Sequence, residues 1–243
     1  MDFYQSIAKY YHHIFPLNKV QVEFIKNSHH DSPNQLSLLD IGCAIGDLSL
    51  ELANNYKSVT AIDLDEEMIN TAIEKAKDKT NLEFRDENML HIDDAFGESS
   101  FNIIACFGNT LVHLESEEMV GVFFEKAKAA LKPNGKLLFQ IINYDRIIDQ
   151  NVNFLPTIEN DTIKFERNYE YLKEQNKVNF ETILTIKESQ YQIKNCIPLL
   201  AIRKSNIEKL LLSAGFSDIQ FFGNFKRDQL IENSMPLIVE AKA

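Results

Sequence analysis

One ten-residue segment constrains the fold of this chain more than any other: Leu38 to Asp47, with the sequence LLDIGCAIGD. It begins with a short apolar run, typical of a buried strand, and ends where an amphipathic helix can start. The small residues Gly42, Ala44 and Gly46 let the backbone of the intervening turn approach a ligand closely. A strand, a small-residue turn and a helix in this order predict an α/β fold with a ligand site at the turn.

Short apolar runs alternate with amphipathic stretches after this segment. We predict strands at 38–41, 58–63, 82–85, 101–106 and 136–142. Apolar residues recur at helical spacing between several of these runs. Strands that alternate with helices predict a doubly wound, mostly parallel sheet.

The period changes after about Tyr144. Apolar and polar residues alternate through 162–171, 178–187 and 191–202, which predicts three antiparallel strands. A capping box at Ser205 and Glu208 predicts the start of another helix, which ends before Gly215. Two further strands complete an expected total of seven in the main sheet.

The predicted organisation therefore has three parts. An aromatic-rich helical lid occupies residues 1–35, with an interruption at Pro16. The α/β core comprises residues 36–143 and 204–243, and a small antiparallel lobe is inserted at 144–203. We expect the lobe to form one wall of a binding site.

The amino-acid composition argues against some classes of binding partner for this chain. With 25 Lys and Arg against 36 Asp and Glu, the 243-residue chain has a formal net charge of −11. Nucleic acids and anionic membranes require clustered basic side chains, so we expect neither as a partner. Cys43, Cys106 and Cys196 form neither a zinc motif nor a disulfide framework, which favours the cytoplasm. We expect no metal site, because adjacent histidines such as His12 and His13 do not share a helix face.

A second acid, Asp63, ends the predicted strand that follows Asp40. Both acids are expected at the carboxyl edge of the sheet, where ligands bind in doubly wound folds. The carboxylate of Asp63 can accept hydrogen bonds from two ribose hydroxyls. The nicotinamide fingerprint G-x-G-x-x-G is not met, because Ala44 and Asp47 occupy its second and third glycine positions. A ribose-containing ligand with a carboxylate in place of phosphates suits this turn better.

These features resemble class I S-adenosylmethionine (SAM)-dependent methyltransferases. The stretch Asp40–Gly46, D-x-G-x-A-x-G, is similar to the first motif of that family, with Ala44 at the usual middle glycine. A methyl group fits there if the backbone φ is negative. Further segments are similar to the ribose-binding motif, the adenine-binding motif and the turn before strand five: 63–68, 84–89 and 131–136.

The resemblance, which covers roughly residues 36–143, implies a Rossmann-like methyltransferase fold, SAM as cofactor and S-adenosylhomocysteine (SAH) as product. The cofactor-binding residues expected on this basis are Tyr11, Asp40, Gly42, Cys43, Ala44, Gly46, Asp63, Leu64, Met68, Glu87, Asn88, Met89, Phe107 and Asn109. Candidate catalytic residues are His113 and Tyr144. Candidate substrate-binding residues are Asn109, His113, Tyr144 and Arg203. Binding of the methionine end of SAM and capping of the following helix are alternative roles for His113.

A narrower resemblance concerns the methyl acceptor. Residues 106–114 and the triplet Asn143-Tyr144-Asp145 are similar to segments of glycine N-methyltransferase and its relatives. In those relatives an arginine directly before the triplet holds the carboxylate of the substrate, whereas this chain has Ile142. We therefore expect an acceptor other than glycine.

The expected activity is transfer of a methyl group to nitrogen or oxygen of a small molecule by in-line displacement. Proximity and orientation would supply most of the catalysis. The alternatives are methylation of a protein or RNA, and a regulatory protein that binds SAM without catalysis. Either a monomer or a homodimer is compatible with the sequence.

Overall fold

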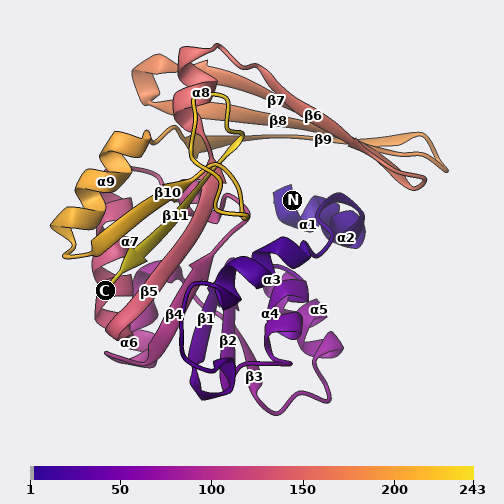
Figure 1. Ribbon diagram of the computed structural model, residues 1–243. Coiled ribbons are helices and arrows are strands. Elements are labelled where there is room, and N and C mark those ends of the chain that lie inside the picture. Colours follow the sequence, from indigo (N-terminus) through magenta and orange to yellow (C-terminus); the bar gives the residue numbers. More distant parts are fainter. Residues whose placement is uncertain (1–2) are drawn as a thin grey trace.

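The computed structural model describes residues 3–243 and contains two separate sheets (Figure 1). The larger sheet has seven strands in the order β10-β11-β5-β4-β1-β2-β3. These strands are β1 (Ser37–Ile41), β2 (Ser58–Asp63), β3 (Leu82–Asp86), β4 (Phe101–Cys106), β5 (Leu131–Ile142), β10 (Ser217–Phe222) and β11 (Pro236–Lys242). Strands β1 to β5 are parallel, whereas β11 runs antiparallel to both β5 and β10. The predicted seven-stranded, mostly parallel sheet is therefore confirmed.

Helices cover both faces of the larger sheet (Figure 1). They are α3 (Lys19–Lys26), α4 (Asp47–Leu52), α5 (Glu66–Lys75), α6 (Ile92–Phe96), α7 (Glu117–Ala130) and α9 (Lys204–Ser213). Successive residues of β1 point to opposite faces, so Leu38 packs in a cluster with α3 and α4, and Leu39 in a cluster with α7 and α9. This two-sided burial explains why the strands read as continuous apolar runs. None of the helices within residues 3–243 has the length and apolar composition needed to span a membrane.

The smaller sheet is antiparallel, with the order β6-β7-β8-β9. It follows the short helix α8 (Tyr144–Asp149) and comprises β6 (Phe154–Glu159), β7 (Ile163–Leu172), β8 (Lys177–Ile186) and β9 (Tyr191–Leu200). The prediction of three strands was wrong, because β6 was missed. Strand β6 is an edge strand that contains Pro156, and its register shifts between Leu155 and Ile158. Proline is tolerated in an edge strand, because its missing N–H can face away from the sheet. Its presence argues against a strand in the sequence pattern, so β6 was not predicted.

The N-terminal segment folds into α1 (Phe3–Ile7) and α2 (Tyr11–Ile14), which precede α3 and lie beside the smaller sheet (Figure 1). Phe3, Ile7 and Ile14 form one apolar cluster with residues of β7 and β8: Ile163, Phe165 and Leu184. The predicted N-terminal helices are confirmed from residue 3 onward; residues 1 and 2 lie outside the described part of the chain. The cluster holds this lid against the inserted sheet.

The last helix, α9, begins differently from the prediction. Ser205 does not cap it; the helix starts one residue earlier, at Lys204. The carboxylate of Asp145, at the start of α8, accepts a hydrogen bond from the Lys204 N–H at 2.9 Å. A tertiary contact thus satisfies a free helix N–H that a local cap usually satisfies. The predicted end is confirmed, since Gly215 has a φ of +85°.

The glycines of the turn after β1 are required by close packing. A Cβ atom at Gly42 would lie 2.4 Å from the Thr110 hydroxyl oxygen, and one at Gly46 would lie 2.6 Å from the Phe84 ring. Both residues have left-handed backbones, with φ of +72° and +78°. The turn is therefore pressed against its surroundings on two sides.

We predict that Gly46→Ala lowers the free energy of unfolding by about 2–4 kcal/mol, because it combines a left-handed penalty with overpacking. Gly108→Ala is the matched control: Gly108 has a φ of +76°, but a Cβ there meets nothing within 4 Å. We expect the control to cost only about 1–2 kcal/mol. Urea denaturation of both variants tests this; equal losses would show that contact with Phe84 contributes nothing.

Candidate active site

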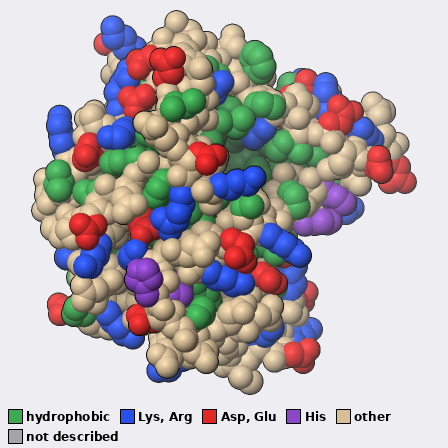
Figure 2. All heavy atoms as spheres, viewed as in Figure 1, with side chains coloured by type: hydrophobic (Ala, Val, Ile, Leu, Met, Phe, Trp, Pro, Cys, Tyr) green, Lys and Arg blue, Asp and Glu red, His purple; other side chains and the backbone are tan. Residues whose placement is uncertain are grey.

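Two adjoining cavities lie at the carboxyl edge of the parallel strands. Cavity A, about 500 Å³, is lined by residues that follow β1, β2 and β3. Cavity B, about 630 Å³, extends from the turn after β1 to the smaller sheet. They share a wall of Phe3, Tyr4, Tyr11, Gly42, Phe107, Gly108 and His113. Figure 2 shows apolar side chains gathered in a hollow between the two sheets.

Asp63 ties the glycine turn to the end of β2. Its carboxylate accepts hydrogen bonds from the Ala44 N–H at 2.8 Å and from the Asp65 N–H at 3.0 Å. Burial raises the pKa of Asp63 above its usual value, while both N–H donors oppose the rise. The carboxylate lines cavity A at the position expected for a ribose ligand.

The backbone of Ala44 differs from the expectation. Its φ is +46°, not negative. A left-handed alanine costs about 1–2 kcal/mol. The charge-assisted hydrogen bond from its N–H to Asp63 offsets part of that cost. Ala44 lines cavity A and packs beside Met68.

Asp40 is buried beneath the turn at the end of β1 and lines cavity B. The Ser49 hydroxyl donates a hydrogen bond to it at 2.5 Å. Burial raises the pKa of Asp40 to about 6, and the neighbouring Asp63 contributes to the rise. A cationic group of a ligand beside Asp40 would lower this raised pKa and stabilise the charged form of the carboxylate.

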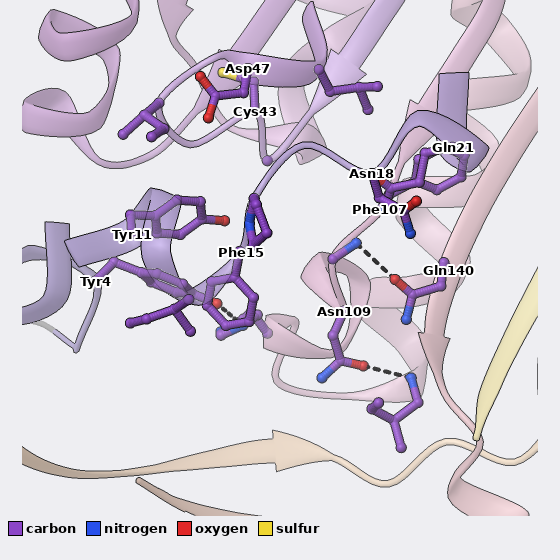
Figure 3. Close-up of a pocket in the computed structure, with 18 of the residues that line it drawn as sticks. Tyr4, Tyr11, Phe15, Asn18, Gln21, Cys43, Asp47, Phe107, Asn109 and Gln140 are labelled. Carbon is purple, nitrogen blue, oxygen red and sulfur yellow. Dashed lines mark hydrogen bonds between the residues drawn. The ribbon is translucent and has the colours of Figure 1, made fainter. Parts of the chain in front are cut away.

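The loop after β4 is attached to β5 by two amide side chains (Figure 3). The Gln140 side chain accepts from the Gly108 N–H at 3.0 Å. The Asn109 side chain accepts from the Ile142 N–H at 2.9 Å and donates to the Tyr144 hydroxyl at 3.3 Å. Asn109 therefore lines cavity B with both ends of its amide engaged.

Tyr144 does not occupy the position predicted for a catalytic or substrate-binding residue. Its side chain is 1% exposed and lines neither cavity. Tyr144 lies behind Asn109, and burial raises its pKa well above the ordinary value. The neutral, buried phenol contacts Asn109, which lines cavity B, and does not line the cavity itself.

The lid meets the core at His113. The Tyr4 hydroxyl and His113 Nε2 form a hydrogen bond of 2.9 Å (Figure 3). Tyr4, Tyr11 and His113 each line both cavities. Burial, with Asp63 nearby, raises the pKa of Tyr11, so its phenol stays neutral. The capping alternative for His113 was wrong, because the Ser116 hydroxyl caps α7 by accepting from the Met119 N–H.

The structure brings together most of the other predicted cofactor-binding residues. Cavity A is lined by Leu64, Met68, Glu87 and Met89, cavity B by Cys43, and both by Gly42 and Phe107. Gly46 lines neither and packs against Phe84 instead. Asn88 also lines neither, and its side chain caps the turn η3 (Met89–His91) by accepting from the Leu90 N–H at 2.9 Å.

Arg203, predicted to bind substrate, lies outside both cavities. Its guanidinium is paired with Asp145 at 2.8 Å and with Asp149 at 2.7 Å. Sequence proximity to the lobe suggested a substrate role, but the partners come from α8. The arginine that does line cavity B is Arg167.

The sequence analysis missed several cavity residues, among them Arg167, Gln140, Gln21 and Thr110. Arg167 could have been identified from the sequence, because it is a charged residue at an inward, otherwise apolar position of β7, between Phe165 and Tyr169. Gln140 had a weaker one, as an amide inside an apolar strand. The others needed the tertiary structure.

Cavity A suits the adenosyl part of SAM. Its lining includes Asp63, Asp65, Glu66, Asp86 and Glu87, and none of its lining residues is Lys or Arg. Carboxylates at this edge can accept from ribose hydroxyls and stabilise a cationic ligand. Gly42 lines both cavities and has no side chain, so the backbone of the glycine turn can approach a ligand closely. With its strand order and two strand-end acids, the core has the fold seen in class I SAM-dependent methyltransferases.

Comparison with known proteins supports this class. Residues 38–135 match the family described as a methyltransferase domain. A Geobacillus sp. (strain WCH70) protein named only as a candidate methyltransferase is 35% identical over 105 residues, covering 43% of this chain and 41% of the relative. The chain thus spans about two fifths of that relative's length. The Glycine/sarcosine N-methyltransferase of Aphanothece halophytica is 28% identical over 195 residues, 78% of this chain and 69% of the relative.

A crystal structure of a SAM-dependent methyltransferase from Clostridium acetobutylicum ATCC 824 shares the fold across the whole chain. The TM-score is 0.81 at 16% identity, and the alignment covers 99% of both chains. Its coverage includes the lid and the inserted sheet. The fold assignment therefore extends beyond the residues matched by the family.

The raised pKa of Asp40 predicts a pH dependence. Because the folded state holds this proton up to about pH 6 and the unfolded state releases it near pH 4, stability falls as pH rises through this window. We expect wild type to lose about 1–3 kcal/mol relative to Asp40→Asn between pH 4 and 6. Urea denaturation of both proteins across that range measures the difference; a constant difference would contradict the prediction.

Proposed function

We propose that the protein transfers a methyl group from SAM to a nitrogen or oxygen atom of a small molecule bound in cavity B. The observation that carries this proposal is the shared wall between the two cavities. Gly42, Gly108 and His113 belong to the lining of both. A cofactor in cavity A would therefore meet a second ligand in cavity B at the glycine turn.

The shape of cavity B supports a small acceptor. The smaller sheet contributes Leu155, Tyr169, Phe180 and Leu199 to its lining, and the N-terminal segment contributes Phe15. These side chains enclose the site from the side opposite the core. A largely apolar cavity of this volume is typical of small-molecule sites.

In this mechanism bound SAM supplies an activated methyl group on a positively charged sulfur. The chain aligns the two reactants and excludes water, which can lower the barrier by about 7–11 kcal/mol. Asp63 and the glycine turn would hold the cofactor, while Asn109 and Gln140 keep the loop after β4 in place. Tyr4 and Tyr11 would cover the site. His113 is the candidate to hold or accept a proton, since it lines both cavities.

The alternatives have less support. Methylation of RNA is disfavoured by the net charge of −11. A protein acceptor would have to pass between the lid and the smaller sheet. A regulatory protein that binds SAM without catalysis would not need the second, adjoining cavity. We also propose a cytoplasmic location and a monomer or homodimer; the free thiols of all three cysteines support a reducing compartment.

Thermal unfolding with SAH tests the cofactor part of the proposal. A ligand present at about 100 times its Kd stabilises a protein by about 2.7 kcal/mol. For a chain of this length we expect the melting temperature to rise by about 5–10 °C with SAH and not with NAD. Asp63→Ala should remove the shift, because it removes the ribose partner and the tie to Ala44.

Asp161→Ala is the matched control, since Asp161 is an exposed acid in the turn between β6 and β7. It should keep the full SAH shift. A shift with NAD alone would overturn the cofactor assignment. A screen of small molecules, protein extract and RNA with methyl-labelled SAM identifies the acceptor class, and label in protein or RNA alone would overturn the small-molecule proposal.

A further inference from the structure

Arg167 interrupts an apolar stripe on the inner face of the smaller sheet. Alternate residues of β7 share one face, and Ile163, Phe165 and Tyr169 are all buried. Arg167 falls between Phe165 and Tyr169 in the same phase, and it lines cavity B. Its cross-strand neighbour on β6 is Leu155, another lining residue. The guanidinium is therefore embedded among the apolar side chains of the cavity.

Arg167 is also one end of a polar row across that face. It pairs with Thr182 of β8, and Thr182 pairs with Asn195 of β9. Directly opposite residues of antiparallel strands place their side chains on the same face. Asn195 donates to the Ser6 hydroxyl of α1 at 3.0 Å, so the far end of the row is satisfied.

Two polar atoms at the other end of this row have no partner. Arg167 Nε and the Thr182 hydroxyl are both buried, and neither makes a hydrogen bond within residues 3–243. Thr182 is 2% exposed. An unsatisfied buried polar group costs about 1–3 kcal/mol. Arg167 is the member of this pair that lines cavity B, so a ligand can reach the row through its guanidinium.

The positive charge of Arg167 is a second indication that a ligand binds at this row. No salt bridge to Arg167 occurs among the described residues, although the chain as a whole is acidic, and Arg167 is the one Lys or Arg among the residues that line cavity B. Burial lowers the pKa of its guanidinium, which reflects the cost of keeping the charge there. Another guanidinium nitrogen of Arg167 donates to the Pro156 carbonyl, which orients the group without neutralising it.

We propose that the guanidinium of Arg167 holds a carboxylate of the methyl acceptor. This inference rests on the proposed function, because it assigns the chemical class of the acceptor for cavity B. A carboxylate in cavity B accepts from the guanidinium and neutralises the arginine. The apolar part of the acceptor then lies against Tyr169, Phe180 and Leu199. The acceptor is thus an amphipathic organic acid.

Binding of benzoate and benzamide to the SAH-loaded protein tests the proposal. The two probes have the same apolar ring and differ in charge. Ligand-observed NMR titration should show benzoate binding, with benzamide at least about tenfold weaker. Arg167→Gln should weaken benzoate about tenfold or more and abolish the preference over benzamide.

Arg85→Gln is the control, since Arg85 is an exposed arginine paired with Glu83 outside both cavities. It should bind benzoate as wild type does. Calorimetry should give every variant an SAH affinity within about twofold of wild type, which also shows that the variants fold. Equal binding of the two probes, no benzoate binding, or full benzoate affinity in Arg167→Gln would overturn the carboxylate assignment alone. Failure of wild type to bind SAH would instead overturn the proposed function.

Discussion

The tie between Asp63 and the turn after β1 is the interaction on which the site depends. A single carboxylate receives N–H groups from Ala44 and Asp65, which belong to two different strand-to-helix connections. It holds the glycine turn in a left-handed conformation that alanine adopts at a cost. The same carboxylate faces cavity A, where the ribose is expected. The Asp63 carboxylate therefore has both a structural role and an expected binding role. Strained backbone, such as the left-handed Ala44, is common at functional sites.

The lid and the inserted sheet, which are distant in sequence, both line cavity B. The lid and the inserted sheet share an apolar cluster and polar ties, including the hydrogen bond from Asn160 to the His13 carbonyl at 2.9 Å. The hydrogen bond between Tyr4 and His113 then connects the lid to the core. Apolar burial supplies the stabilisation, while the polar contacts set the position of the lid. The roof of cavity B also packs on the glycine turn, because Tyr4 and Tyr11 of the N-terminal segment lie against Ala44 and Ile45.

Pattern alone predicted much of the fold. Strands β1, β2 and β4 were expected within a residue of their observed bounds, because two-sided burial makes them continuous apolar runs. Errors fell where distant contacts decide the outcome. Strand β6 contains Pro156 and pairs only at an edge, and α9 is capped by Asp145 rather than by Ser205. Arg203 was assigned to the site because it flanks the lobe, and Tyr144 was a candidate in the triplet that resembles glycine N-methyltransferases. Arg203 instead pairs with α8, and Tyr144 is enclosed behind Asn109.

The sequence by itself determined the α/β core, the acids at the ends of β1 and β2, and the small-residue turn between them, since these follow from local periodicity and backbone sterics. Only the tertiary structure decided which side chains face the second cavity. Arg167, Thr182 and Asn195 lie on three different strands, and they form a row because of the antiparallel register. Register depends on pairing between distant segments, which no local pattern encodes. The proposed cofactor site could therefore be predicted from the sequence, whereas the residues of the proposed acceptor site could be identified as one site only from the fold.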